Sequence, residues 1–383
     1  MNNTKFIEKL LDGVEVEWLA LGDVAKYSDM RIDCTGIDEK NYVGVDNLLQ
    51  NRAGKTNSTY VPTEGRLIEY RLGDILIGNI RPYLKKIWLA NQSGGTNGDV
   101  LVVRPTHESL SSGYLHQVLT DENFFAYNMQ HAKGAKMPRG DKAKILEYKF
   151  PIPCPENPKK SLEIQAEIVR ILDTFTELTA ELTSELTARK KQYNYYRDQL
   201  LSFEDGEVEL KRLGDIVRIK NGKDHKTLGD GEYPVYGSGG IMRYADTYAY
   251  NKPSVLIPRK GSLGNLFFVD VPFWNVDTIF YTQIDEVQIC PKFLYYFLTT
   301  VGLGEMNQAG GVPSQTQSVL NELKIPVPPL AEQARIVAIL DKFDALTNSL
   351  TEGLPREIEL RQKQYEYYRD VLLSFPKPEE AEA

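Results

Sequence analysis

The sequence predicts a protein of the α+β (mixed α/β) class, in which two similar globular domains alternate with two long helices. Three observations support this prediction. The chain repeats itself along its length, each repeat ends in a long run of regularly spaced apolar residues, and the stretches between these runs contain short strand patterns and turns. With 383 residues, the chain is long enough for two or three domains that each bury a core.

Composition excludes several classes of protein. No stretch approaches the ~18 consecutive apolar residues of a membrane span, and the N-terminus has neither the apolar run nor the cleavage site of a secretory signal. The three cysteines, Cys34, Cys154 and Cys290, are scattered and odd in number, which argues against a disulfide framework. We therefore expect a protein of the reducing cytoplasm.

Charge is unevenly distributed along the chain. The formal net charge is −8, but residues 78–149 carry ten basic and six acidic residues, a balance of +4. The segment 161–204 has five basic and eight acidic residues, a balance of −3. A protein that binds DNA needs a local basic face rather than a basic total, although charge alone favours an ordinary acidic cytosolic protein.

Internal duplication is the strongest signal in the sequence. Residues 189–203, RKKQYNYYRDQLLSF, match residues 361–375, RQKQYEYYRDVLLSF, at twelve of fifteen positions. Upstream, QAEIVRILDTF at 165–175 matches QARIVAILDKF at 333–343. Weaker matches follow, namely KFPIP 149–153 with KIPVP 324–328, LGDVA 21–25 with LGDIV 213–217, DILI 74–77 with SVLI 254–257, NGD 97–99 with NVD 275–277, and Pro138 with Pro313.

Each long helix has an apolar seam. From Ile164 and from Ile336, apolar residues recur at steps of four and three, the spacing of a coiled coil. We expect the two helices, each about 40 residues or roughly 60 Å long, to pair antiparallel. The alternative is that each seam packs against a globular domain. Gly353 and Pro355 should kink the second helix.

The first helix contains a tetrapeptide repeat. FTELTAELTSELT at 175–187 repeats T-x-E-L, and each unit adds about one helical turn, near 6 Å, while the seam keeps roughly the same direction. Such a segment is suited to an adjustable spacer.

Domain boundaries follow from the repeat and from the Pro-rich turns PIPCPENP and PVPPL. The predicted parts are an N-terminal stub that completes the helical repeat (1–15), a first recognition domain (16–155), a central long helix (156–204), a second recognition domain (205–328), a C-terminal long helix (329–376) and a flexible tail (377–383). Strands are expected at 74–78, 86–90, 100–104, 254–258, 266–269 and 278–282, and short helices at 112–119 and 291–299.

Polar and basic loops recur at matching places in the two globular parts. Arginine and lysine suit phosphates and guanine edges, asparagine and glutamine suit adenine edges, and glycine lets a loop approach a duplex closely. A solvated surface charge is an equally ready explanation for any single residue, but the loops as sets favour DNA contact. The candidate DNA-binding residues are Arg81, Lys85, Lys86, Lys133, Lys136, Arg139, Lys142, Lys223, Tyr236, Ser238, Arg243, Arg259, Lys260, Ser314, Gln315 and Gln317.

The sequence offers no match to three kinds of catalytic or cofactor-binding motif, namely a phosphate-binding loop, a metal-ligand cluster and an amino-methyltransferase tetrapeptide. GKT at 54–56 lacks the glycine that a phosphate-binding loop needs, because Leu49 stands there. The four histidines form no ligand spacing with cysteines or carboxylates, and PVPPL lacks the flanking residues of an amino-methyltransferase tetrapeptide. The expected class is a binding module with no catalytic residue and no metal site.

The arrangement resembles the specificity subunits of type I restriction-modification enzymes. The resemblance covers nearly the whole chain. The residues that carry it are the paired PIP and PVPP turns, the Q-A-x-I-V-x-I-L-D-x-F helix starts, the KQYxYYRDxLLSF helix ends and the T-x-E-L spacer. Among the groups of this family, the spacer is most similar to that of the type IC group. The break at Gly353–Pro355 departs from a perfectly matched helix pair.

The resemblance implies a function and a set of partners. Each recognition domain would read one half of a bipartite DNA site, and the helices would set the distance between the halves and dock two methyltransferase subunits. Those subunits would supply S-adenosylmethionine binding and adenine methylation by base flipping, and restriction subunits that use ATP and Mg²⁺ would join them. This chain itself would bind no cofactor. The alternative is a coiled-coil scaffold that binds only protein partners.

Overall fold

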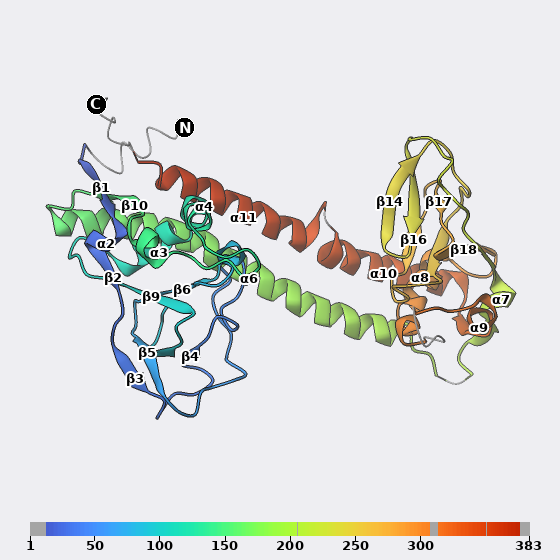
Figure 1. Cartoon of the computed structure of the whole chain (residues 1–383). Coiled ribbons are helices and arrows are strands. Elements are labelled where there is room, and N and C mark those ends of the chain that lie inside the picture. Colours follow the sequence, from blue (N-terminus) through green and yellow to red (C-terminus); the bar gives the residue numbers. More distant parts are fainter. Residues whose placement is uncertain (1–12, 205, 307–312, 350, 376–383) are drawn as a thin grey trace. The chain divides into compact units, whose positions relative to one another are not determined.

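The computed structural model describes residues 13–204, 206–306, 313–349 and 351–375. The chain divides into two compact units (Figure 1). The first unit comprises residues 1–181 together with 359–383, and the second comprises residues 182–358. The predicted N-terminal stub lies, apart from its last three residues, outside the described residues, as does the predicted tail.

The first unit contains two four-stranded sheets and one two-stranded sheet. The principal sheet is antiparallel, in the order β2 (Ala25–Tyr27), β9 (Val100–Pro105), β6 (Ile75–Gly78) and β7 (Ile87–Leu89). The second sheet has the order β3 (Arg31–Asp33), β5 (Arg66–Tyr70), β8 (Gly94–Thr96) and β4 (Tyr42–Val43). A separate antiparallel pair joins β1 (Val16–Ala20) to β10 (Lys149–Pro153).

Short helices connect these strands, and three of them begin at a side-chain cap. The helices are α2 (Leu21–Val24), η1 (Pro82–Leu84), α3 (Ser112–Leu119), α4 (Glu122–Gln130) and α5 (Lys142–Leu146). Ser111, Asp121 and Asp141 accept backbone N–H bonds at the starts of α3, α4 and α5. These residues satisfy N–H groups that have no partner within the helix, which fixes where each helix begins.

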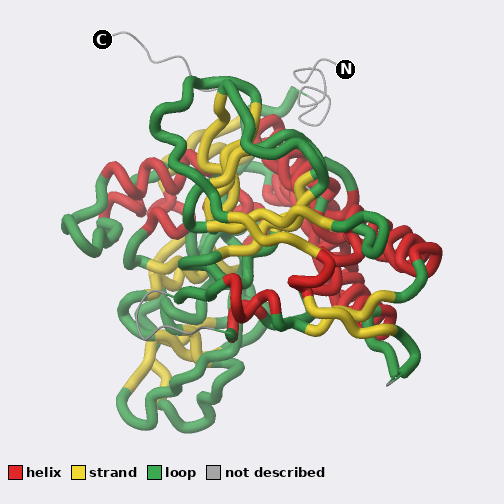
Figure 2. The backbone as a smooth tube through the Cα atoms, turned by 90° about the vertical axis from the view of Figure 1, so that its right-hand side faces the viewer, coloured by secondary structure: helices red, strands yellow, loops and turns green. Residues whose placement is uncertain are grey.

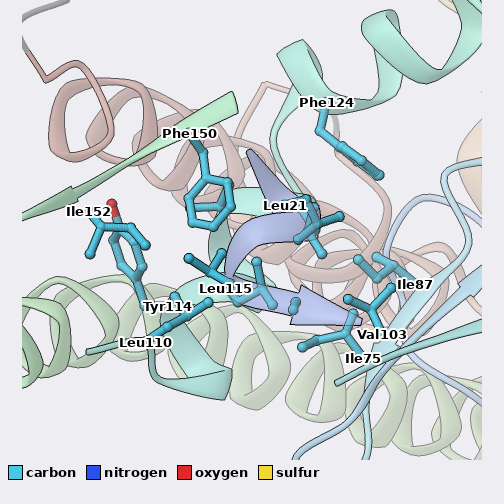
Figure 3. Close-up of a cluster of buried hydrophobic side chains, with 14 of the residues drawn as sticks. Leu21, Ile75, Ile87, Val103, Leu110, Tyr114, Leu115, Phe124, Phe150 and Ile152 are labelled. Carbon is cyan, nitrogen blue, oxygen red and sulfur yellow. The ribbon is translucent and has the colours of Figure 1, made fainter. Parts of the chain in front are cut away.

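The core of the first unit forms where the principal sheet meets α3 and α4. Figure 3 shows Ile75, Ile87 and Val103 from the sheet facing Leu115 of α3, with Phe124 of α4 nearby. All five side chains are almost fully buried. Because β6 and β9 are buried on both faces, their sequences are continuous apolar runs, which is why the sequence identifies these strands readily.

The second unit has the same plan with different small sheets. Its principal sheet has the order β12 (Val217–Lys220), β18 (Ile279–Ile284), β15 (Ser254–Pro258) and β16 (Phe267–Val269). A second sheet contains β14 (Gly240–Ala245), β13 (Tyr233–Gly237) and β17 (Trp274–Asn275), and β11 (Glu209–Arg212) pairs with β19 (Lys324–Val327). The helices are α7 (Leu213–Ile216), α8 (Pro291–Leu298), η2 (Leu303–Glu305) and α9 (Gln317–Asn321). Long loops separate these short elements (Figure 2).

The two principal sheets are equivalent strand by strand, since β2-β9-β6-β7 and β12-β18-β15-β16 follow the same order. Their register corrects one predicted match. Gly78 lies opposite Val100 in one sheet, and Pro258 lies opposite Ile279 in the other. Residues 78 and 258 are equivalent, so their partners Val100 and Ile279 are equivalent too. Counting back three residues from each partner makes residue 97 correspond to residue 276. The predicted pairing of 97–99 with 275–277 is therefore wrong by one residue.

Three long helices carry the repeated helical sequences, namely α6 (Pro158–Leu200), α10 (Leu330–Asn348) and α11 (Gly353–Leu372). In the first unit, the ring of Phe175 in α6 stacks on Tyr368 of α11 at 5.1 Å, and the two segments run in opposite directions (Figure 1). In the second unit, Tyr196 of α6 stacks on Phe343 of α10 at 5.9 Å. Equivalent residues thus form equivalent antiparallel pairs.

The first turns of each helix pack differently from the later turns. Ile164 and Ile168 of α6 belong to the core of the first unit, and Ile336 and Leu340 of α10 belong to the core of the second. The seam therefore begins by packing against a globular domain and continues as a helix pair. Both arrangements weighed from the sequence occur, each over its own part of the helix.

The helical repeat is broken where the sequence predicts a kink. Helix α10 ends at Asn348, and α11 begins at Gly353, whose φ is +76°. A Cβ atom at this position would collide with the carbonyl oxygen of Ala345, so only glycine fits. Pro355 lies in the first turn of α11, where its missing N–H costs no hydrogen bond. No helix among the described residues is long and apolar enough to cross a membrane.

Candidate nucleic-acid interface

The predicted basic loops of the first unit lie side by side. The first loop pair is formed by residues 79–85, after β6, and residues 131–141, before α5. The Arg81 N–H donates to the Pro138 carbonyl at 2.7 Å, and the Gly140 N–H donates to the Asn79 carbonyl at 3.2 Å. These backbone bonds make one surface from two loops that are about 50 residues apart in the sequence.

The second unit contains the same construction at equivalent positions. The second loop pair is formed by residues 259–263, after β15, and residues 313–316, before α9. The Gly261 N–H donates to the Pro313 carbonyl at 2.9 Å, and the Gln315 N–H donates to the Arg259 carbonyl at 3.0 Å. Each loop pair is also tied to the residue just before the neighbouring strand, because Asn79 N–H donates to Asp99 O before β9 and Arg259 N–H donates to Thr278 O before β18, both at 2.8 Å.

Two of the predicted DNA contacts in the first unit have partners inside the protein. Lys85 Nζ lies 2.6 Å from Glu122 Oε2, and Arg52 also binds this carboxylate, at 2.5 Å. Burial opposes ionisation of Glu122, but the hydrogen bonds from Lys85 and Arg52 outweigh it and lower its pKa to about 2. Lys86 Nζ donates to the Val45 carbonyl at 2.6 Å. Lys85 and Lys86 therefore shape the loop.

The remaining cations of the first loop pair are directed to solvent. Lys133 pairs with Asp141 at 2.6 Å and Arg139 pairs with Asp99 at 3.1 Å, and both cations are largely exposed. Such exposed pairs contribute little stability, so both cations remain available to a phosphate. Arg81 and Lys136, and Lys142 just beyond them, are exposed, and within the described part of the chain their side chains form no hydrogen bond or ion pair.

The second loop pair presents fewer charges. Lys260 is exposed and forms a β-bridge with Ser314, while the Arg259 guanidinium carbon lies 5.8 Å from the centre of the Phe280 ring. Gln317 Nε2 donates to Asn221 Oδ1 at 3.1 Å. Gln315 is buried, and its Nε2 donates to the Pro258 carbonyl at 2.6 Å. Gln315 therefore supports the loop from beneath.

The other candidates of the second unit fall into two groups. Lys223 is exposed, and Ser238 is partly exposed with its N–H bonded to Thr278 Oγ1. Tyr236 packs against Phe267 and Phe273, and burial raises its pKa. Arg243 donates to the carbonyls of residues 228 and 229 and pairs with Asp230 at 2.7 Å. The structure thus gives Tyr236 and Arg243 partners within the unit.

Sequence reasoning missed residues that lie beneath or beside the loops. The space next to Gly140 is lined by Oδ1 of Asn79 and Oδ1 of Asn128, and neither buried oxygen has a partner among the described residues. Only the packing of α4 brings Asn128 there, so no sequence motif could reveal it. On β14, Ile241, Met242 and Tyr244 expose large apolar side chains. These three residues lie in the same short segment as the predicted Tyr236, Ser238 and Arg243, so the sequence places them beside the candidates.

The described residues of the two loop pairs hold no cluster of metal ligands. Within the described ranges, no three His, Cys, Asp or Glu residues are grouped closely enough to hold a metal ion. Burial lowers the pKa of His116 to about 4, but this histidine belongs to α3 in the core region and not to either loop pair. The geometry offers two binding surfaces made of loops, each attached to a rigid sheet.

Comparisons with known proteins agree with this description. The type I restriction modification DNA specificity domain matches the chain twice, at residues 14–189 and 205–360. The chain is 38% identical to the EcoR124I/EcoR124II specificity subunit of Escherichia coli, with 99% of each chain covered. It is 33% identical to the type I restriction enzyme EcoprrI specificity subunit of the same organism, covering 92% of this chain and 93% of that one.

Solved structures show the same fold. The S subunit of a type I restriction-modification system from M. genitalium superimposes with a TM-score of 0.62 at 17% identity, covering 96% of this chain and 98% of that one. A chain from a study of complex assembly of the type I R-M system gives a TM-score of 0.61 at 16% identity, covering 94% of this chain and 98% of that one. Two matched domains, two equivalent sheets and two equivalent loop pairs identify this chain as a member of the type I restriction-modification specificity subunit family, the subunits that give these enzymes their DNA sequence specificity.

Proposed function

We propose that each unit reads one half of a bipartite duplex DNA site through its loop pair, and that the chain has no catalytic activity of its own. One observation carries this proposal. In both units, equivalent backbone hydrogen bonds join two equivalent loops at the end of an inner strand of the principal sheet. The side chains on these loops differ between the units. A scaffold that is repeated within the chain and carries different side chains in each copy suits two half-sites of different sequence.

The chemistry of the loops supports this reading. Arg81, Lys136 and Arg139 on the first loop pair provide donors for phosphates and guanine edges, and Lys142 extends this basic surface. Arg259, Lys260 and Ser314 on the second pair provide a smaller set. Lys133, Lys223 and Ser238 flank these residues. We assign Lys85, Lys86, Tyr236, Arg243, Gln315 and Gln317 to supporting the loops, because their side chains are partly or fully buried and are held by hydrogen bonds, an ion pair or ring packing within their own unit.

We also propose that the long helices bind partner subunits. Tyr195 of α6 and Tyr367 of α11 occupy equivalent positions in the repeat and are 60% and 50% exposed. Two equivalent aromatic surfaces fit two copies of one partner, because aromatic side chains are enriched in protein interfaces. We assign this partner as the methyltransferase subunit, which would bind S-adenosylmethionine and methylate adenine. ATP and Mg²⁺ would bind to the restriction subunits and not to this chain.

The test is selective binding by the assembled complex. The chain is combined with its modification subunits, and the motif methylated in a host that carries the genes is read by single-molecule sequencing. Duplexes with that motif, with either half replaced, or with both halves replaced are then compared for affinity and methyl transfer. We expect both halves to be required. Equal binding to all duplexes would favour the alternative, a coiled-coil scaffold for proteins alone, and methyl transfer by the isolated chain would contradict the non-catalytic assignment.

A further inference from the structure

We propose that Arg81 recognises a guanine in the first half-site and is the main base-reading residue of the first loop pair. This inference rests on the proposed function and assigns a chemical target to one side chain. It begins from an unusual backbone conformation. Arg81 has φ 52° and ψ 64°, which lies in the left-handed region.

The second unit shows what this position requires. Residue 81 corresponds to Gly261, since both N–H groups donate to the equivalent prolines Pro138 and Pro313. Gly261 also has a positive φ, 83°. Glycine adopts this conformation without strain, whereas a residue with a Cβ atom does not. Arg81 is disfavoured twice, because Pro82 follows it and pushes the preceding residue toward extended backbone.

The other left-handed residues have explanations within the protein. Five described residues other than glycine have a positive φ, namely Asn51, Arg52, Arg81, Lys85 and Cys154. Arg52 and Lys85 bind Glu122, Cys154 is buried, and asparagine tolerates this conformation. Arg81 is exposed and its side chain forms no hydrogen bond or ion pair with the described residues. Strain without an intramolecular contact indicates a function outside the fold.

The backbone around Arg81 is held on both sides. Its N–H donates to Pro138 O at 2.7 Å, and its carbonyl accepts from the Leu84 N–H at 2.9 Å. The side chain therefore projects from a fixed point, which reduces the entropy lost when it binds. A neighbouring cation, Arg139, must give up its exposed ion pair with Asp99 before it can bind DNA, whereas Arg81 has no such pair to give up among the described residues.

The shape of the guanidinium and its hydrogen-bond donors favour guanine as the base that Arg81 binds. Its planar fork donates two parallel hydrogen bonds to O6 and N7 of guanine in the major groove, which is the commonest specific contact of arginine with DNA. A phosphate would also attract Arg81, but lysine would serve a phosphate nearly as well. The exchange of arginine for lysine therefore separates base reading from charge alone.

Three variants in the complex with the modification subunits test the inference. Arg81→Lys keeps the charge and loses the fork, Arg81→Gly removes both and relieves the strain, and Arg66→Ala removes an exposed cation of the same unit that lies on β5, outside the loop pair. We expect Arg81→Lys and Arg81→Gly each to lose about tenfold in affinity for the cognate duplex. The methylated motif of the Arg81→Lys host should become degenerate at a single G·C pair. Arg81→Gly should melt within about 2 °C of the wild type or above it.

Each contrary result has a distinct meaning. Arg81→Lys with affinity within twofold of wild type and an unchanged motif would overturn base reading. Equal losses of affinity in Arg81→Gly and Arg66→Ala would show that only net charge matters, and a markedly lower melting temperature for Arg81→Gly would remove the strain argument. If the wild-type complex itself shows no preference for its own methylated motif, the proposed function fails rather than this assignment.

Discussion

Arg369 of α11 lies with its Nε 3.1 Å from Asp121 Oδ2, and the two side chains are only 2% and 7% exposed. This ion pair joins the C-terminal helix to the start of α4 within the first unit. The second unit has no equivalent pair, because Thr300 stands at the position of Asp121 and Arg197 pairs with the exposed Asp198.

Replacing Asp121 by Asn should destabilise the first unit strongly. The variant leaves the buried Arg369 with only the exposed Asp370, 3.0 Å away, and loss of a buried partner typically costs about 3–5 kcal/mol. Asp198→Asn in the second unit is the matched control, and it should cost less than about 1 kcal/mol because Asp198 is exposed. Thermal unfolding of both variants measures the difference. Similar small effects in the two would show that the buried pair contributes no more than a surface pair.

Gln165 and Gln333 should be equally important to their own units. Gln165 accepts from the Ser111 N–H at 2.9 Å and donates to the Ser109 carbonyl, and Gln333 accepts from the Cys290 N–H at 2.7 Å and donates to the Gln288 carbonyl at 3.1 Å. A change to Leu leaves the Ser111 and Cys290 N–H groups without the acceptors that the glutamines supply, which should cost about 2–4 kcal/mol.

Chemical denaturation of Gln165→Leu and Gln333→Leu measures this loss. The control is Gln364→Leu in α11, an exposed glutamine whose replacement should change the free energy of unfolding by less than about 0.5 kcal/mol. Loss in only one of the two buried variants would contradict the equivalence of the units.

Inserting one TAEL after Leu182 should lengthen the spacer between the half-sites by one or two base pairs. Four residues add about 6 Å to α6, against about 3.4 Å for each base pair. Methylome sequencing reads the spacer directly. As a control, an insertion of only two residues rotates the following helix by about 200° and should abolish methylation. An unchanged motif after the TAEL insertion would contradict the ruler function.

Arg259→Ala should weaken binding to the cognate duplex by at least about 1 kcal/mol if this side chain reads a base. Arg212→Ala is a matched control, because Arg212 is an exposed arginine of the same unit that pairs with Glu322 at 3.2 Å. Fluorescence anisotropy of the complex on labelled duplexes makes the comparison. Unchanged affinity and methylation in Arg259→Ala would remove this residue from the interface.

Stability should fall as the solution becomes acidic because of His116. Burial lowers the pKa of this histidine from 6.5 to about 4. The unfolded chain therefore takes up a proton near pH 6.5 that the folded chain refuses until about pH 4. The full contribution is present above pH 6.5 and is lost between these values, on the order of 2 kcal/mol for a partly shielded side chain.

Unfolding of wild type and His116→Gln between pH 4 and pH 8 isolates this effect. The variant has no group that titrates at this position, so its stability should depend less on pH across that window. Parallel profiles for the two proteins would assign the acid sensitivity to other residues.

The parts of the fold that could be predicted are those fixed by local pattern. The strands β6, β9 and β15 are continuous apolar runs, and the helix seams repeat over many turns, so periodicity identifies them. The second sheet of each unit could not be predicted. Strands such as β4 and β17 are two residues long, and β8 reads GGT, so their existence depends on distant backbone partners.

The candidate site was predictable to the level of loops but not of side chains. The matched prolines Pro138 and Pro313 mark both loop pairs correctly in the sequence. Which cations remain free was not predictable, because Lys85 is bound by Glu122, 37 residues away, and Gln315 is turned inward to Pro258, 57 residues away. The one-residue error at 97–99 arose because short sequence identities outweighed the register of the sheets.

The break before Gly353 makes the two helical repeats unequal in continuity. The first repeat, α6, is an unbroken helix from Pro158 to Leu200, so every inserted residue lengthens it by about 1.5 Å. The second repeat is divided into α10 and α11, with non-helical chain at Ser349, Thr351 and Glu352. A tetrapeptide gained by slippage in α6 therefore has no unbroken counterpart that it must match. We expect a single such event to be enough to create a new target spacing.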